Sequence, residues 1–236
     1  MKLHRFIIED DFSKDSFSFT DTKLIHQLYA VLHLKAGEEC IVSDGSRNEA
    51  RCRITAISQN ACVCDVIDRS YNTNENEVYG ALYCSLLKKE HFEVVAQKAT
   101  DAGVCEIIPI ISRRTVKLSA PPMERLHAII KEAAEQSGRG VIPTLCDAIP
   151  FDEAIRRASD SHSMTFFYHM EGIPFAEWKK QNIAPKKANI FIGPEGGWDE
   201  YELNEARKNN FSVISLGKTI FRAETAAIIG SYLAIH

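Results

Sequence analysis

From residue 78 onwards, apolar segments typical of β-strands alternate with amphipathic segments typical of α-helices. The pattern predicts strands over residues 78–87, 106–111, 164–170, 189–192 and 212–216, and helices over residues 89–102, 123–137, 199–208 and 224–235. Strands that alternate with helices form a mostly parallel sheet with helices on both faces. The sequence therefore predicts an α/β domain over residues 78–236.

Residues 1–72 show a different pattern, in which turns separate short strands. Strands are expected over residues 5–9, 39–43, 49–57 and 61–68, with one helix from residue 21 or 22 to residue 32. Asp44-Gly45 between two apolar segments is a strong hairpin signal. We expect a small β-barrel-like domain here, joined to the α/β domain by the polar linker of residues 73–77.

Composition excludes several classes of protein. The formal charge of −4 argues against nonspecific coating of nucleic acid, and the apolar runs are too short to span a membrane. Seven cysteines without a Cys-x-x-Cys motif fit a reducing compartment and argue against a metal site. The N-terminus turns acidic too early for a signal peptide. We expect a cytoplasmic protein with no membrane partner and no bound metal.

Two glycine-containing loops follow predicted strands and lead into predicted helices. The first is Gly193-Pro194-Glu195-Gly196-Gly197, after which Asp199 and Glu202 resemble a capping box. The second spans residues 216–226. Such loops face each other at the carboxyl ends of a parallel sheet, so we expect one shared pocket.

The residues of the two loops suit a cationic or adenine-bearing ligand. Glu195 and Glu224 can balance a positive centre, and Ile220 and Phe221 can form an apolar slot. The sequence contains neither the Gly-x-x-x-x-Gly-Lys-Ser/Thr nor the Gly-x-Gly-x-x-Gly phosphate loop. Gly217-Lys218-Thr219 would complete the first motif only with a glycine at position 212, which is Ser212. Two alternatives stay open at this point: each loop can be an ordinary strand end or helix start, or the pair can serve another nucleotide-binding enzyme, which would bind ATP or NAD.

Several of these segments together resemble a known family. Residues 97–104, 132–139, 191–198 and 216–226 resemble the motifs of the 16S rRNA uracil-N3 methyltransferases, the RsmE family of the SPOUT superfamily. Residues 4–6 and 31–37 resemble its N-terminal PUA-like domain. The resemblance covers nearly the whole chain.

This resemblance implies a fold, a cofactor and a substrate. The fold would be a SPOUT α/β domain with a C-terminal trefoil knot, preceded by a PUA-like β-barrel. The methyl donor would be S-adenosylmethionine, bent among three loops at residues 167–171, 193–197 and 216–221. The substrate would be 16S rRNA in the 30S subunit, methylated on uracil N3 at uridine 1498, and the protein would be a homodimer with its pocket near the subunit boundary.

The resemblance also implies roles for individual residues. Arg222 would bind the uracil carbonyls or a nearby phosphate and stabilise developing negative charge, and Glu195 or Glu224 would accept the N3 proton. Residues expected to bind the cofactor are Tyr168, His169, Gly193, Pro194, Glu195, Gly196, Gly197, Leu216, Gly217, Thr219, Ile220, Phe221 and Thr225. Residues expected to contact RNA are Arg5, Lys88, Arg113, Arg114, Gln136 and Arg139.

Four residues depart from the family pattern. His33 stands in place of an arginine, Asp101-Ala102 in place of Glu-Leu, and Phe221 in place of a leucine. Histidine makes a weaker phosphate contact than arginine. The departure at His33 thus bears on RNA affinity more than on catalysis. A separate alternative function is an RNA-binding protein, in which the barrel clamps RNA and the C-terminal domain has lost catalysis.

Overall fold

The computed structural model describes residues 3–115 and 122–236. Its contacts divide the chain into two compact units. The first contains the residues up to Glu75 together with Gly138–Ile142, and the second contains Asn76–Ser137 and Pro143–His236. The first division lies within the segment expected to be a linker. The sequence pattern did not indicate that Gly138–Ile142 belongs with the N-terminal unit.

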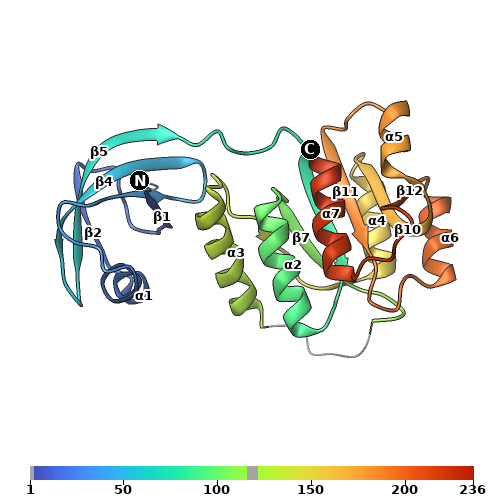
Figure 1. Cartoon of the computed structure of the whole chain (residues 1–236), viewed down its shortest axis with the longest axis horizontal. Coiled ribbons are helices and arrows are strands. Elements are labelled where there is room, and N and C mark those ends of the chain that lie inside the picture. Colours follow the sequence, from blue (N-terminus) through green and yellow to red (C-terminus); the bar gives the residue numbers. More distant parts are fainter. Residues whose placement is uncertain (1–2, 116–121) are drawn as a thin grey trace. The chain divides into compact units, whose positions relative to one another are not determined.

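A five-stranded sheet with the order β1-β3-β4-β5-β2 forms most of the first unit (Figure 1). Its strands are β1 (His4–Ile7), β2 (Ser16–Phe19), β3 (Glu39–Ser43), β4 (Asn48–Ile57) and β5 (Cys62–Tyr71). The β1–β3 pair is parallel and the other three pairs are antiparallel. Alternate residues such as Val42, Ile54 and Cys64 are fully buried and form the core. The short strand β2 was not predicted.

The helix expected near residues 22–32 changes its hydrogen-bond pattern halfway. α1 (Thr22–His26) begins after Asp21, whose side chain accepts hydrogen bonds from the Lys23 and Leu24 amides. It continues as the π-helix η1 (Gln27–Val31), in which the Leu32 N–H donates to the Gln27 carbonyl.

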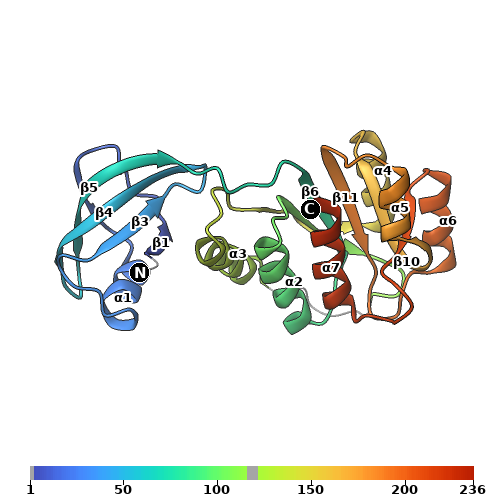
Figure 2. The same cartoon turned by 45° about the horizontal axis from the view of Figure 1, so that its top comes forward.

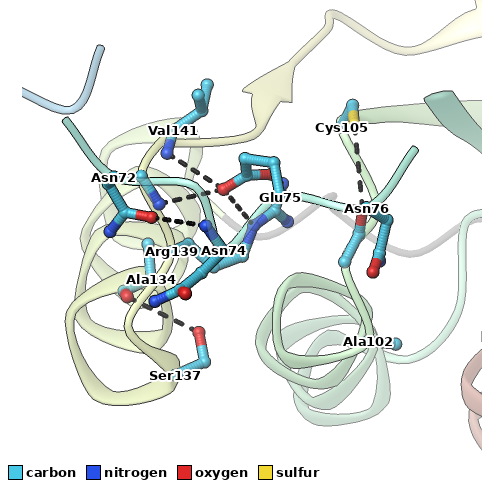
Figure 3. A network of polar contacts seen from close by, with 12 residues as sticks. Asn72, Asn74, Glu75, Asn76, Ala102, Cys105, Ala134, Ser137, Arg139 and Val141 are labelled. Carbon is cyan, nitrogen blue, oxygen red and sulfur yellow. Dashed lines mark hydrogen bonds and ion pairs between the residues drawn. The ribbon is translucent and has the colours of Figure 1, made fainter. Parts of the chain in front are cut away.

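The segment Gly138–Ile142 is fixed in the first unit by a buried carboxylate. The Glu75 side chain accepts hydrogen bonds from Arg139 Nη2 at 2.6 Å, the Gly140 amide at 2.9 Å and the Val141 amide at 3.1 Å (Figure 3). Asn72 Nδ2 donates to the Gly138 carbonyl at 3.2 Å. Glu75 therefore does not belong to a freely solvated linker, since its side chain is only 5% exposed, whereas residues 73, 74 and 77 are exposed.

The second unit contains a parallel sheet with the order β12-β10-β11-β6-β7-β8, and β9 also pairs with β7. Its strands are β6 (Tyr79–Ser85), β7 (Glu106–Ile111), β8 (Thr144–Leu145), β9 (Ile149–Pro150), β10 (Met164–Pro174), β11 (Lys187–Ile192) and β12 (Ser212–Ser215). Every pairing in this sheet is parallel. The prediction of an α/β domain with a mostly parallel sheet is confirmed.

Helices cover both faces of this sheet, as Figures 1 and 2 show. They are α2 (Lys89–Asp101), α3 (Met123–Ser137), α4 (Phe151–Asp160), α5 (Phe175–Gln181), α6 (Glu200–Lys208) and α7 (Ala223–Ile235). α2 packs between α3 and α7, and α7 also contacts β6 and β11. α4 and α6 lie over the opposite face, where the core includes stacked rings of Tyr83 and Phe191, 4.5 Å apart.

Two of these helices, α4 and α5, were not predicted, although α4 carries a clear signal. Its buried residues Phe151, Ala154, Ile155 and Ala158 follow the spacing of one helix face. By contrast, the capping box at the start of α6 is confirmed. Asp199 Oδ1 accepts from the Tyr201 amide at 3.0 Å, and the Asp199 amide donates to Glu202 Oε2 at 2.8 Å.

Within the described part of the chain, no helix is both long and apolar enough to cross a membrane.

Candidate active site

A cavity of about 900 Å³ lies in the second unit, at the carboxyl ends of β11 and β12. Its walls come from the two glycine loops, from residues 168–171 of β10 and from the first turns of α2 and α7. Cavities of this size and mixed lining are typical small-molecule sites. The two loops therefore face one shared space, as the sequence predicted.

Almost all the predicted cofactor and catalytic residues line this cavity. They are Tyr168, His169, Gly193, Pro194, Glu195, Gly196, Gly197, Leu216, Gly217, Thr219, Ile220, Phe221, Arg222 and Glu224. The exception is Thr225, which is not among the lining residues although its neighbour Ala226 is.

Trp198 fixes the first glycine loop against the sheet. Its indole Nε1 donates to the Tyr168 carbonyl at 3.1 Å, and its ring stacks on Phe167 at 4.5 Å. A Cβ at Gly193 would lie only 3.1 Å from that indole, so any larger residue there would have to displace the ring by a few tenths of an ångström. Gly197 has a positive φ of 69°, the conformation that glycine adopts at least cost.

An irregularity in β10 forms the opposite wall. The pairing of β10 with β12 shifts register between Tyr168 and Ile173, and the residues between them turn towards the cavity. His169 Nδ1 accepts a hydrogen bond from the Glu171 amide at 3.2 Å. Partial burial lowers the pKa of His169 below its ordinary value, against the opposing effect of Glu171, so the imidazole is neutral at pH 7.

Tyr168 contributes a rigid, neutral hydroxyl beneath this wall. The hydroxyl donates to the Gly230 carbonyl in α7 at 3.0 Å. Burial raises the pKa of Tyr168 well above its ordinary value, because the phenolate would lose its hydration. Tyr168 therefore joins β10 to α7 and does not exchange a proton near neutral pH.

The ionisable groups of the cavity wall favour a positive ligand. Glu171, Glu195 and Glu224 all line the cavity, and Glu195 Oε1 accepts from the Lys88 amide at 3.3 Å. Carboxylates here would repel the phosphates of ATP or NAD. The alternative of another nucleotide-binding enzyme is therefore disfavoured by charge.

Arg222 stands at the rim of the cavity, immediately before α7 begins. Its side chain is exposed, and among residues 3–115 and 122–236 no hydrogen bond or ion pair engages the guanidinium. This exposed guanidinium is therefore available to an anionic or carbonyl-bearing ligand.

Comparisons with known proteins agree with this geometry. The protein-family model for the RNA methyltransferase domain matches residues 74–234 of this chain, and the family model for the RNA methyltransferase PUA domain matches residues 19–67. The ribosomal RNA small subunit methyltransferase E of Mesomycoplasma hyopneumoniae is 34% identical over 177 residues, which cover 72% of this chain and 74% of the relative. The chain belongs to the ribosomal RNA small subunit methyltransferase E family.

Two further members of the family are similar over nearly the full length. The methyltransferase E of Bacillus subtilis is 28% identical over 223 residues, covering 90% of this chain and 87% of the relative. The crystal structure of methyltransferase E from Neisseria gonorrhoeae, which holds S-adenosyl methionine, superposes with a TM-score of 0.86 at 26% identity. The superposition covers 98% of this chain and 95% of the Neisseria gonorrhoeae chain.

The residues expected to contact RNA fall into two groups in this methyltransferase. Lys88, Arg113, Arg114 and Gln136 have exposed side chains in the second unit. Arg113 stacks on the Tyr201 ring at 3.9 Å, and Arg114 Nη1 donates to the Gly196 carbonyl at 3.1 Å. Arg114 thus supports the glycine loop. Arg113 and Arg114 open the basic run Arg113-Arg114-Thr115-Val116-Lys117, whose last two residues lie outside the described residues.

Arg5 and Arg139 lie in the first unit, where both are engaged internally. Arg5 forms an ion pair with Glu49, and Arg139 is only 4% exposed and pairs with Glu75. A buried, paired guanidinium is poorly placed to bind phosphate, because leaving its carboxylate would leave an uncompensated buried charge. These two arginines stabilise the first unit, contrary to the expectation that they present their charge to RNA.

The sequence missed several lining residues of this methyltransferase site, among them His91 and Trp198. Trp198 directly follows the glycine loop, and an aromatic residue at a loop-to-helix junction is a recognisable signal of packing. His91 gave no local signal, because it lies in the first turn of α2, far along the chain from both loops.

Proposed function

We propose that this protein methylates N3 of a uracil in 16S rRNA, using S-adenosylmethionine as the methyl donor. The target would be uridine 1498, presented by the 30S subunit in the cytoplasm. The observation that carries the proposal is the single cavity formed by both glycine loops inside the matched RNA methyltransferase domain. Its carboxylates and apolar lining suit a ligand with a sulfonium and an adenine.

The cavity lining fits the methyl donor chemically. Gly193 to Gly197 and Leu216 to Gly217 offer backbone groups, and Ile220 and Phe221 offer apolar surface for the adenine. Glu195 and Glu224 would face the positive end of the cofactor. When bound, the cofactor supplies an electrophilic methyl group on a sulfonium.

The residues of this chain would prepare the uracil as the nucleophile. Uracil N3 carries a proton and lies on the base-pairing edge, so the base must be unpaired before it reacts. Glu195 or Glu224 would accept that proton. Arg222 would bind a uracil carbonyl and stabilise the negative charge that develops as the proton leaves. Orientation would supply much of the rate.

Lys88, Arg113, Arg114 and Gln136 are the proposed RNA contacts of the second unit. Their exposure supports this role, as does the planar guanidinium of Arg113, which already stacks on an aromatic ring. Each phosphate contact would make binding weaker at higher salt.

The finer features of the fold also belong to this proposal. They are closure of the N-terminal sheet into a PUA-like barrel, a C-terminal trefoil knot and a homodimer. The dimer is supported by α7, which after its polar first turn is largely apolar without a distinct polar face and still exposes Tyr232. Ile220 and Phe221 before α7 are also exposed.

Two measurements test the proposed function. Calorimetry should show binding of S-adenosylmethionine but not of ATP or NAD, and failure of the folded protein to bind the methyl donor would reject it. Incubation with 30S subunits that lack the modification, followed by nucleoside mass spectrometry, should yield 3-methyluridine. Cofactor binding without any methylated product would instead favour the alternative of an RNA-binding protein without catalysis.

A further inference from the structure

Three ionisable side chains from distant parts of the sequence converge on one wall of the cavity. His91 extends from the first turn of α2, Glu195 from the loop after β11 and Glu224 from the first turn of α7. His91 Nδ1 lies 3.7 Å from Glu195 Oε1 and 4.0 Å from Glu224 Oε2. One imidazole nitrogen is therefore placed between two carboxylates.

Two of these atoms are buried without a hydrogen-bond partner. They are His91 Nδ1 and Glu224 Oε2, and neither is bonded within the part of the chain that the structure describes. Buried polar atoms are nearly always paired in folded proteins. Because a carboxylate can only accept, the donor between His91 and the two glutamates must be the imidazole.

The present distances need only a small change to become hydrogen bonds. A nitrogen and an oxygen form a hydrogen bond at roughly 2.7–3.2 Å, so side-chain movements of about 1 Å would bring both oxygens within reach of the single Nδ1–H, which they would share in a three-centre bond. Glu195 already accepts from the Lys88 amide, three residues before His91. The α2 terminus is thus already bonded to the glycine loop.

We propose that His91 is a positioning residue of the methyltransferase site. It carries a proton on Nδ1 and bridges the carboxylates of Glu195 and Glu224, which would otherwise repel each other. The bridge holds the glycine loop and the start of α7 at the separation that the methyl donor requires. This inference rests on the proposed function.

The bridge acts on the shape of the cofactor site rather than on the transfer step. Its loss should therefore weaken cofactor binding and raise the KM for S-adenosylmethionine, while kcat at saturating cofactor changes little. A residue that only stabilised the fold would instead lower the melting temperature without this division between KM and kcat.

Substitutions that move the donor by one bond provide a matched test. In His91→Asn the amide nitrogen lies near the position of Nδ1, whereas in His91→Gln it lies near that of Nε2 and points past the carboxylates. His91→Leu removes the donor and keeps much of the side-chain volume. We expect the Asn variant to bind S-adenosylmethionine within about threefold of the wild type, and the Gln and Leu variants to bind about tenfold or more weakly.

A double-mutant cycle adds a second readout. In the Glu224→Gln background, His91→Leu should weaken cofactor binding by less than in the wild type, because one partner of the bridge is already changed. Affinities are measured by calorimetry and folding by thermal unfolding of each variant.

The outcomes separate this inference from the proposed function. Equal affinities in the wild type and the Leu variant, or equally weak binding by the Asn and Gln variants, would overturn the bridge alone. No binding of S-adenosylmethionine by the wild type would overturn the proposed cofactor, and the bridge with it.

Discussion

At Arg222, an exposed guanidinium without a partner in the described part of the chain leads to a prediction about catalysis. Arg222→Ala should lower kcat by about 10²–10³-fold, the usual effect of removing one group that stabilises transition-state charge. Cofactor affinity should stay within about threefold, and the melting temperature should not change, because the guanidinium forms no hydrogen bond or ion pair with any described residue. Single-turnover methylation of 30S subunits measures the effect.

Arg222→Lys is the matched control, because it keeps the charge and loses the planar fork. We expect it to retain part of the activity. Equal product from the wild type and the Ala variant would show that Arg222 has no role in the transfer.

At Glu75, the balance between burial and pairing predicts a pH-dependent stability. Burial alone would raise the pKa of Glu75, but hydrogen bonds and charge from Arg139 and the amides of residues 140 and 141 outweigh it, and the pKa lies below its ordinary value of 4.5. A carboxyl group with a lowered pKa stabilises the fold above its ordinary pKa, and that contribution disappears as the pH falls through the folded value. The stabilisation is therefore present at pH 7 and is lost below about pH 4.5.

Glu75→Gln should destabilise the first unit by about 3 kcal/mol at pH 7, because Arg139 loses its buried counter-charge. The difference in the free energy of unfolding between this variant and the wild type should shrink as the pH falls below about 5. Amide hydrogen exchange in β4, corrected for the intrinsic rate at each pH, measures it. Glu9→Gln, at an exposed position, is the control and should show no such trend. A difference that stays constant with pH would contradict the argument.

At the scale of elements, the irregular strand β10 depends on a close approach between Gly172 and the backbone of Ile214 in β12. A Cβ at Gly172 would lie 2.6 Å from the Ile214 nitrogen and 2.7 Å from its Cα, and backbone atoms of β12 cannot move aside as a side chain would. Residues 169–171 line the cavity next to this contact. The register shift that shapes the cavity wall therefore requires glycine at this position.

Gly172→Ala should separate β10 from β12 locally, at a cost of about 1–3 kcal/mol, and weaken S-adenosylmethionine binding about tenfold. Thermal unfolding and calorimetry measure the two effects. Ile173→Ala, at the neighbouring half-exposed position, removes atoms without adding any and should bind the cofactor within about threefold of the wild type. Unchanged affinity in the Gly172 variant would show that the wall tolerates the displacement.

At the scale of the whole molecule, the exposed apolar surface of α7 predicts the effect of a charge on assembly. Tyr232 is 54% exposed on this helix, and a carboxylate buried in a subunit interface would cost several kcal/mol. Tyr232→Glu should therefore shift the proposed dimer to monomers in sedimentation velocity experiments. Tyr71→Glu, which changes another exposed tyrosine in the first unit, should leave the dimer intact. A dimer that survives in the Tyr232 variant would place the interface elsewhere.

Features that depend on neighbours along the chain could be predicted from the order of the amino acids alone. Periodicity gave the strands and helices of the α/β domain, and the turn chemistry of residues 193–197 and 216–222 gave two loops at one end of a parallel sheet. The capping box at Asp199 could be predicted for the same reason, since its partners lie within one helical turn. α4 carries the same kind of local signal and was predictable in principle.

Contacts between distant segments arise only once the chain has folded. Arg139 resembles an exposed helix-end cation in sequence, but Glu75 buries it and draws Gly138–Ile142 into the first unit. His91 meets Glu195 and Glu224 only because α2, the glycine loop and α7 end at the same wall of the cavity. Local propensity determines where a helix or a loop begins. The partner of a charged side chain depends instead on which distant strands and helices the sheet brings together.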